Sequence, residues 1–269
     1  YTKELFTIIS ELTPQGLEGS VSTLPGSFKE FEADESLIIS QFIELAGFLD
    51  ALSEVSGRDL HLGLEPEPRG HIENTEETLR FFDRLLDAAP DHEQIKRRIG
   101  INYDCCHFAL QYEGARTSLN ALRGEGLRIS KIHLSAALAL DPRNPAAVKA
   151  VGAFDEPVYL HQVLARHPDG RIERYTDLPE GIASLETEDG RQAEEWRVHF
   201  HVPLDAEPEE PLLSTRENAR EALLLAEEVP GLCQHWEIET YTWGVLPAGM
   251  QRPVEEQIAA EYRWVLGGS

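Results

Sequence analysis

Strand-like and helix-like segments alternate along most of this chain, and their order constrains the fold more than any other feature. Hydrophobic periodicity and end signals predict strands over 19–25, 60–65, 99–104, 128–135, 196–204 and 235–243. They predict helices over 1–12, 34–55, 74–86, 92–98, 113–123 and 214–226, and a last helix from 253. Such alternation is typical of a parallel sheet covered by helices. An open nucleotide-binding sheet is the alternative, but no Gly-rich phosphate loop follows a strand.

The polarity of three predicted strands favours a closed (β/α)8 barrel, the TIM barrel. Apolar and polar residues alternate in KIHLS at 131–135, RVHFHV at 197–202 and HWEIE at 235–239. A barrel packs one strand face on its helices and turns the other inward. We count about six strands where such a barrel needs eight. Because the chain starts at Tyr1 inside a helical pattern, we expect the first strands to lie upstream.

One segment interrupts the alternation. Two β-rich runs at 158–166 and 171–175 are joined through Pro168-Asp169-Gly170, which predicts a β-hairpin. Acidic, Gly-containing sequence follows to about residue 195. We therefore interpret the chain as a single TIM-barrel domain over 1–269, with an insertion at about 141–195 that contains the hairpin at 158–175.

Overall charge and cysteine content narrow the class of protein. The 269 residues carry 48 acidic and 24 basic side chains, a formal charge of −24, which argues against binding nucleic acid or an anionic membrane. No apolar run in the sequence reaches the length expected of a membrane span, and no signal-peptide pattern opens the chain. The three cysteines do not form a disulfide framework. These features predict a cytoplasmic protein without membrane insertion.

The segment His61–Pro68 (HLGLEPEP) predicts a short strand that stops at a carboxylate. Leu62 and Leu64 fall on one face of the strand, and Pro66 cannot donate to a ladder, so Glu65 should lie at the strand's tip. Parallel α/β proteins place their chemistry at that end of their strands. The alternative is a surface glutamate in a polar loop.

Strand ends elsewhere carry similar residues. The four strand-end candidates are Glu65, Asp104, His133 and Glu239. Carboxylates and an imidazole together suit a divalent ion such as Mn²⁺, Mg²⁺, Co²⁺ or Zn²⁺. For any one residue taken alone, a core histidine or a structural salt bridge is the competing interpretation. The coincidence of all four at predicted strand ends makes a metal site the working hypothesis.

Further side chains near these strand ends suggest substrate contacts. His107, three residues after Asp104, suits an outer contact to the metal or a contact to substrate, and His199 with His201 forms an alternative metal pair. Cys105 and Cys106 are interpreted as small apolar fillers, because neighbours in an extended strand point to opposite faces. Arg69, Lys131 and Arg197 could offset the negative charge of the site or grip an anionic substrate, and solvated or salt-bridged roles are the competing interpretation. Glu67 and Glu237 are reserve carboxylates.

Several of these motifs resemble a known family. LEP at 64–66, the D-x-x-H step at 104–107, HLS at 133–135 and ET at 239–240 resemble the xylose-isomerase-like TIM-barrel superfamily of sugar isomerases, ketose epimerases and endonuclease IV-type enzymes. The ordered set LEPEP, NYDCCH, KIHLSAAL, YLHQV, RVHFHVPL and EIETYTW is more specifically similar to the EboE-type metabolite traffic proteins. The resemblance runs from about residue 20 to 246.

The resemblance implies roles for individual residues. It makes Glu65, Asp104, His133 and Glu239 the metal ligands, with Glu65 and Glu239 also acting as acid and base, and His107 as a substrate contact. The HFHVP strand departs from the plain epimerase pattern, so His201, a further substrate-binding candidate, competes with His133 for the metal. No Asp-x-His pair follows HLS, which together with the charge argues against a DNA-repair role.

The leading hypothesis is therefore a metal-dependent isomerase- or epimerase-like enzyme acting on a small polyhydroxylated or carbonyl metabolite, in a metabolite biosynthesis or export context. A non-catalytic metabolite carrier on the same barrel is the alternative hypothesis. Hydrolysis at the same metal site is a third hypothesis. If early strands lie outside the chain, exposed sheet edges would be paired in a homo-oligomer or by the upstream segment.

Overall fold

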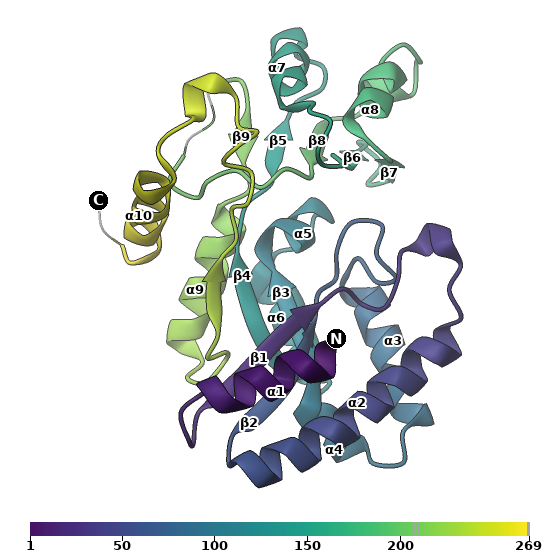
Figure 1. Cartoon of the computed structure of the whole chain (residues 1–269). Helices are drawn as coiled ribbons and strands as arrows, with labels where there is room; N and C mark the ends of the chain where they lie inside the picture. The colour runs from purple at the N-terminus through teal and green to yellow at the C-terminus, as the bar shows by residue number, and fades with distance from the viewer. Residues whose placement is uncertain (207, 209, 268–269) are drawn as a thin grey trace. The chain divides into compact units, whose positions relative to one another are not determined.

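The computed structural model describes residues 1–206, 208 and 210–267, and the chain divides into two compact units. Unit 1 comprises Tyr1–Asp104, Glu113–His133 and Leu224–Glu237. Unit 2 comprises the described residues of Cys105–Tyr112, Leu134–Leu223 and Ile238–Ser269. Figure 1 shows the elements of both units.

The sheet of unit 1 is a curled, parallel half-barrel. Its strands lie in the order β1-β2-β3-β4-β10. They are β1 (Glu18–Thr23), β2 (Asp59–Leu64), β3 (Ile99–Asp104), β4 (Ile129–Leu134) and β10 (Trp236–Ile238). β1 to β4 pair with their neighbours in parallel, and the N–H of Ile132 donates to the carbonyl of His235 beside β10. The mixed α/β class predicted from the sequence is confirmed, whereas closure into an eight-stranded barrel stays a prediction.

Helices cover the sheet of unit 1. They are α1 (Thr2–Leu12), α2 (Glu35–Ser56), α3 (Thr75–Ala88), α4 (His92–Arg98) and α6 (Ala115–Gly124), with a short 3₁₀ turn η1 (Lys29–Phe31). α2 packs against β2, α1 and α4 (Figure 1). Asn74 caps α3 by accepting a hydrogen bond from the N–H of Glu77 at 2.9 Å, as the sequence predicted. The apolar stripe predicted for α3 is confirmed at Phe82 and Leu85, which are buried, whereas Ile8 and Leu12 of the stripe predicted for α1 are exposed and α1 buries Phe6 instead.

α2 corrects one expectation from the sequence. Its 22 residues contain an 18-residue window with a mean hydropathy of 1.4, so by length and composition it could cross a membrane. The test is weak, because the core helix of a globular unit passes it too. α2 buries Ile38, Phe42, Leu45 and Leu49 among its apolar side chains, and its packing inside unit 1 accounts for the hydropathy.

A β-bulge in β4 sets the register between β3 and β4. Ile101 pairs with Ile129 but Asn102 pairs with Lys131, so Ser130 is an extra residue on β4. Beyond the bulge Asp104 lies opposite His133. Without the extra residue Asp104 would face Ile132, and the imidazole of His133 would turn to the helix side, since side chains alternate.

Close packing at Gly100 supports this bulge, which gives a testable prediction. In a Gly100→Ala variant the new Cβ would lie 2.4 Å from Ser130 Oγ and 2.5 Å from the carbonyl oxygen of Arg128. We expect the free energy of unfolding to fall by about 2–3 kcal/mol, measured by urea denaturation. Gly124→Ala, at the end of α6 with open space around it, is the control and should keep full stability. Equal stability of the two variants would contradict the packing described here.

Unit 2 is built on an antiparallel sheet. Its strands lie in the order β7-β6-β8-β5-β9. They are β5 (Leu138–Leu140), β6 (Val163–Arg166), β7 (Ile172–Tyr175), β8 (Glu195–Val198) and β9 (Leu213–Ser214). The helices are α5 (Cys105–Leu110), α7 (Pro145–Val151), α8 (Leu178–Ser184) and α10 (Val254–Val265), with 3₁₀ turns η2 (Gly152–Phe154), η3 (Gly190–Gln192) and η4 (Ala248–Met250). α9 (Glu217–Glu228) runs from unit 2 into unit 1 along the chain.

Several predicted elements differ in unit 2. The hairpin at 158–175 is confirmed as β6 and β7 joined through Gly170, but β6 starts only at Val163. The strand predicted over 196–204 was wrong beyond Val198, and β8 runs antiparallel between β5 and β6 instead of in a parallel barrel. The strand over 235–243 is confirmed only at β10. Alternating polarity indicates extended backbone but does not identify its ladder partner, which here is far along the chain.

Candidate metal centre

Three side chains predicted as metal ligands converge at the carboxyl end of the unit 1 sheet. Glu65 directly follows β2, Asp104 ends β3, and His133 lies one residue before the end of β4. Nδ1 of His133 lies 3.3 Å from Oε1 of Glu65 and 3.5 Å from Oδ2 of Asp104. All three residues are buried, and Asp104 is fully so. The parallel register and the bulge at Ser130 are what bring them together.

Asn102 also belongs to this cluster, although the sequence patterns did not identify it as a site residue. Its Nδ2 donates to Oε2 of Glu65 at 2.8 Å and lies 3.2 Å from Nε2 of His133. The residue is fully buried. It shares a strand face with Gly100 and Asp104, so the alternation of β3 was the signal that could have found it. Asn102 fixes one oxygen of Glu65 and leaves the other beside the imidazole.

Glu237 and Lys131 lie at the edge of the same cluster. Oε2 of Glu237 lies 3.6 Å from Nε2 of His133 and 2.6 Å from Nζ of Lys131. Contact with His133, and then the ion pair with Lys131, lower the pKa of Glu237 to about 2 although partial burial opposes this. Lys131, predicted to bind substrate, is thus engaged by Glu237. Glu237, interpreted only as a reserve carboxylate, is closer to His133 than the sequence suggested.

The donor set fits a divalent cation. Two carboxylates and one imidazole are the ligand types that Mn²⁺, Co²⁺, Zn²⁺ and Mg²⁺ accept. Ligand atoms about 2.0–2.2 Å from one ion lie roughly 3–3.5 Å apart in octahedral or tetrahedral geometry. The separations of 3.3 and 3.5 Å from His133 to the carboxylates match that spacing. Glu65, Asp104 and His133 could therefore hold such an ion with little rearrangement.

The other predicted site residues belong to unit 2. The N–H of Glu239 donates to the carbonyl of Leu134 at 3.2 Å, and its place among the metal ligands stays a prediction. Nε2 of His107 lies 3.4 Å from Nε2 of His201. Arg197 binds Glu195 at 2.8 Å and lies over the ring of Tyr112, 4.3 Å from its centroid. Unit 2 thus brings His107 and His201 together and ties Arg197 into its own packing.

The extended conformation assumed for 104–107 was wrong. β3 ends at Asp104 and α5 begins at Cys105, so Cys105, Cys106 and His107 are helical. Both cysteines are fully buried. The argument that only one cysteine can face inward does not hold for a helix, where successive side chains are about 100° apart. Cys106 is therefore a candidate metal ligand, which the interpretation as an apolar filler had excluded.

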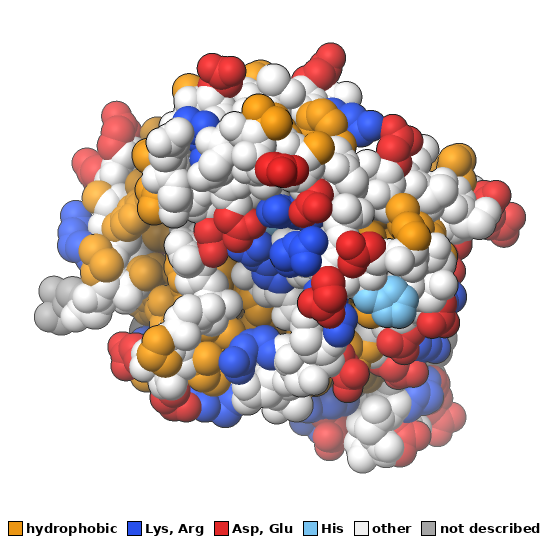
Figure 2. Space-filling view, turned by 90° about the horizontal axis from the view of Figure 1, so that it is seen from below, with side chains coloured by type: hydrophobic (Ala, Val, Ile, Leu, Met, Phe, Trp, Pro, Cys, Tyr) orange, Lys and Arg blue, Asp and Glu red, His pale blue; other side chains and the backbone are white. Residues whose placement is uncertain are grey.

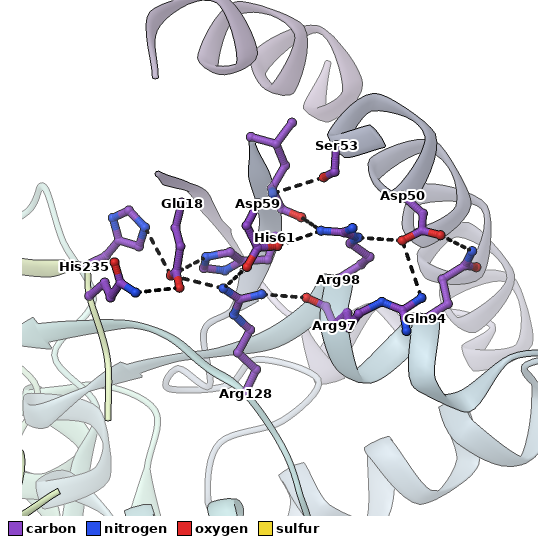
Figure 3. A network of polar contacts seen from close by, with 12 residues as sticks. Glu18, Asp50, Ser53, Asp59, His61, Gln94, Arg97, Arg98, Arg128 and His235 are labelled. Atoms are coloured by element: carbon purple, nitrogen blue, oxygen red, sulfur yellow. Dashed lines mark hydrogen bonds and ion pairs between the residues drawn. The ribbon is translucent and has the colours of Figure 1, made fainter. Parts of the chain in front are cut away.

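A second cluster in unit 1 lies at the opposite, amino ends of the strands (Figure 3). Glu18, His61 and His235 each offer a ligand atom within 4.8 Å of the others. Oε2 of Glu18 lies 3.3 Å from Nε2 of His61 but also 3.1 Å from Nη2 of Arg128. Because the guanidinium of Arg128 already pairs with the carboxylate of Glu18, we interpret this cluster as an ion-pair network and not as a cation site.

The network extends along the strand starts. Arg128 also donates to Asp59 at 2.7 Å, and Arg98 donates to Asp59 at 2.7 Å and to Asp50 at 2.9 Å (Figure 3). The hydrogen bond with His61, and then the charge of Arg128, lower the pKa of Glu18 to about 2 against the effect of burial. Burial lowers the pKa values of His61 and His235, so both favour the neutral form. These residues tie β1, β2, β3 and β4 together.

The depressed pKa of Glu18 predicts an acid-sensitive contribution to stability. Its contribution is complete above the ordinary pKa of 4.5 and is lost as pH falls through about 2. We expect Glu18→Gln to be less stable than wild type at neutral pH, and the two stabilities to converge between these pH values. Urea denaturation between pH 4.5 and about 2 measures the difference in the free energy of unfolding between the two proteins. Both proteins contain His61 and His235, so the difference reports on Glu18. A gap that stays constant with pH would contradict the assignment.

Charges of opposite sign are mixed on the surface. On the face that Figure 2 shows, basic side chains gather near the centre and acidic side chains surround them. Within unit 1, Arg116 pairs with Glu228 at 2.6 Å and Arg84 pairs with Glu35 at 2.5 Å. Much of the positive charge is thus neutralised by neighbouring carboxylates.

No model of a known protein family matches the chain, and no curated protein matches it. A crystal structure of the IolI protein with a bound zinc atom is similar to part of the chain, with 16% sequence identity and a TM-score of 0.33. The similarity covers 49% of this chain and 42% of that chain, so less than half of either is matched. Membership of the xylose-isomerase-like superfamily, and of its EboE-type branch, stays a prediction.

Proposed function

We propose that the carboxyl end of the unit 1 sheet holds a divalent metal ion and that the protein is an isomerase- or epimerase-like enzyme. The observation that carries the proposal is the convergence of Glu65, Asp104 and His133. Nδ1 of His133 lies 3.3 Å from the carboxylate of Glu65 and 3.5 Å from that of Asp104. Their position at the carboxyl ends of parallel strands supports a reactive site over a structural one. The ion is one of Mn²⁺, Mg²⁺, Co²⁺ or Zn²⁺.

The buried residues of this site have separable roles. When bound, the ion would polarise a carbonyl or enediolate oxygen of the substrate. Glu65 would take a proton from one carbon, with its orientation fixed by the 2.8 Å hydrogen bond from Asn102. Asp104 and His133 serve as ligands. The contact with His133 and the ion pair with Lys131 lower the pKa of Glu237 to about 2, so Glu237 would add a carboxylate charge beside the ion.

Glu239 is the proposed fourth ligand and the partner of Glu65 in proton transfer. It directly follows β10, as Glu65 directly follows β2, so both are strand-end carboxylates. This assignment rests on sequence position and on the resemblance to the epimerases. His107 is proposed as a substrate contact on the same grounds.

The proposed substrate is a small polyhydroxylated or carbonyl metabolite. The formal charge of −24 disfavours a nucleic-acid substrate. The resemblance to EboE-type proteins suggests a role in the synthesis or export of such a metabolite. A proton transfer between adjacent carbons is a reaction that two carboxylates and one metal ion can perform with few other groups.

Solvent deuterium exchange tests the function without a known product. The full chain, loaded with Mn²⁺ or Zn²⁺, is incubated in D₂O with a panel of ketoses, aldoses and hydroxy-carbonyl compounds, and mass spectrometry follows deuterium uptake at carbon. We expect uptake into at least one compound, abolished by Glu65→Gln and kept in Glu54→Gln, an exposed glutamate of α2. Tight binding of a compound without uptake would overturn the enzyme proposal and identify a carrier.

A further inference from the structure

Unit 2 contains a second group of metal-ligating side chains with a different chemical character. Cys106 lies on α5, and His199 and His201 follow β8. One ligand atom of each lies within 4.8 Å of the other two. Cys106 and His201 are fully buried, and His199 is partly exposed. These are a sulfur and two imidazole nitrogens, whereas the unit 1 site is rich in oxygen.

Local structure aims both imidazoles at the same region. The alternation of the segment after β8 places His199 and His201 on one side and Phe200 on the other. Phe200 packs edge-on against Phe154, with centroids 5.0 Å apart, and stacks on His161. The N–H of His199 donates to the carbonyl of Gln162 at 2.9 Å and fixes the start of the segment. The two histidine rings lie 5.4 Å apart.

His201 is oriented in the way that metal-bound histidines usually are. Its Nδ1 lies 2.7 Å from the carbonyl oxygen of Glu239, so Nδ1 donates there and Nε2 is the ligand atom. The hydroxyl of Thr242 donates to the carbonyl of His201 at 2.5 Å and holds the backbone. A histidine fixed through one nitrogen presents the other as a neutral, basic ligand.

His107 lies next to this group in unit 2. Its Nε2 lies 3.4 Å from Nε2 of His201, and its ring lies 5.1 Å from that of His199. Among the described residues, the group that contains Cys106 with one ligand atom each within 4.8 Å is Cys106, His199 and His201, so His107 lies beside the proposed ligands and is not one of them.

We propose that Cys106, His199 and His201 bind a zinc-type ion of their own, with a water molecule or an exchangeable ligand completing the tetrahedron. Thiolate and imidazole ligands select Zn²⁺ or Co²⁺ over Mg²⁺ and Mn²⁺. Binding transfers the thiol proton of Cys106 to solvent and forms the metal–sulfur bond. His201 then serves this ion and does not compete with His133. The proposal is independent of the function proposed for the unit 1 site.

Cobalt binding to the metal-free full chain tests this site directly. A Co²⁺–thiolate bond gives a near-ultraviolet charge-transfer band that oxygen and nitrogen ligands do not give. We expect the band to appear with one equivalent of Co²⁺ in wild type and to disappear on addition of Zn²⁺. We expect Cys106→Ser and Cys106→Ala to lack it, and His201→Ala to bind Co²⁺ about 100-fold more weakly.

The other two cysteines provide matched controls. Cys105→Ala alters the neighbouring buried thiol on the same helix, and Cys233→Ser alters a half-buried thiol in unit 1; both should keep the band. His133→Ala should also keep it, which separates this site from the one in unit 1. No band in wild type, a band that survives in both Cys106 variants, or a band lost in Cys105→Ala would each overturn the proposal.

Discussion

Replacing Asp104 with Asn is expected to weaken the binding of Mn²⁺ or Zn²⁺ to the unit 1 site by about 100-fold or more. Asp104 is fully buried and lies 3.5 Å from His133, so it contributes both charge and a ligand atom. Asn keeps the shape but removes the negative charge that offsets the cost of burying a dication. Isothermal titration of metal-free protein measures the affinity. The Cys106→Ser background removes binding to the unit 2 site from the measurement.

Two comparisons make this result specific. Asp83→Asn, at an exposed position of α3, changes the formal charge by the same amount and should leave the affinity unchanged. Circular dichroism of metal-free Asp104→Asn checks that the fold is kept. Wild-type affinity in Asp104→Asn would exclude this carboxylate as a ligand.

Replacing Trp196 with Ala is expected to lower the free energy of unfolding by about 3–5 kcal/mol. Trp196 is fully buried on β8, where it pairs with Leu140 of β5 and Ala165 of β6, and its ring lies 6.5 Å from that of Tyr175. Truncation would leave a large cavity in the centre of the antiparallel sheet. Chemical denaturation followed by circular dichroism measures the change.

Trp264 on α10 is the matched control for this substitution. It is only partly buried and lies under the guanidinium of Arg220 at 5.2 Å. Trp264→Ala should cost about 1 kcal/mol or less. If both variants lost the same stability, the central position of β8 in the unit 2 sheet would be refuted.

Local patterns were sufficient to predict the strands and helices of unit 1. Asn74 and Glu77 marked the start of α3, and Pro66 marked the end of β2, because capping and the missing proline donor act over a few residues. Strand-end chemistry followed from the same signals, which is why Glu65, Asp104 and His133 could be proposed together from sequence.

Features that depend on distant residues could not be predicted. The bulge at Ser130 depends on its packing against Gly63 and Gly100 on neighbouring strands, which no local pattern reveals. The extended backbone expected after Asp104 is replaced by α5, which begins at Cys105 directly after β3 ends. β5 pairs with β8 across more than fifty residues, so the antiparallel sheet had no signal within either strand.

The two ends of the unit 1 sheet carry different sets of charged side chains. The amino ends carry the Glu18, Asp59, Arg98 and Arg128 network, in which cations and carboxylates neutralise each other. The carboxyl ends carry Glu65, Asp104 and His133, where carboxylates outnumber the lysine nearby. In parallel α/β proteins this asymmetry separates stability from chemistry. The predicted effects of Glu18→Gln on stability and Asp104→Asn on metal affinity follow that division.

The most direct test of the metal centre is the anomalous density of a crystal of the full chain grown with Mn²⁺. We predict a peak about 2.0–2.3 Å from the carboxylates of Glu65 and Asp104 and from a ring nitrogen of His133. A further ligand from Glu239 would confirm the fourth position. Saturating Mn²⁺ with no peak between these three side chains, or a peak only at other residues, would contradict the central claim.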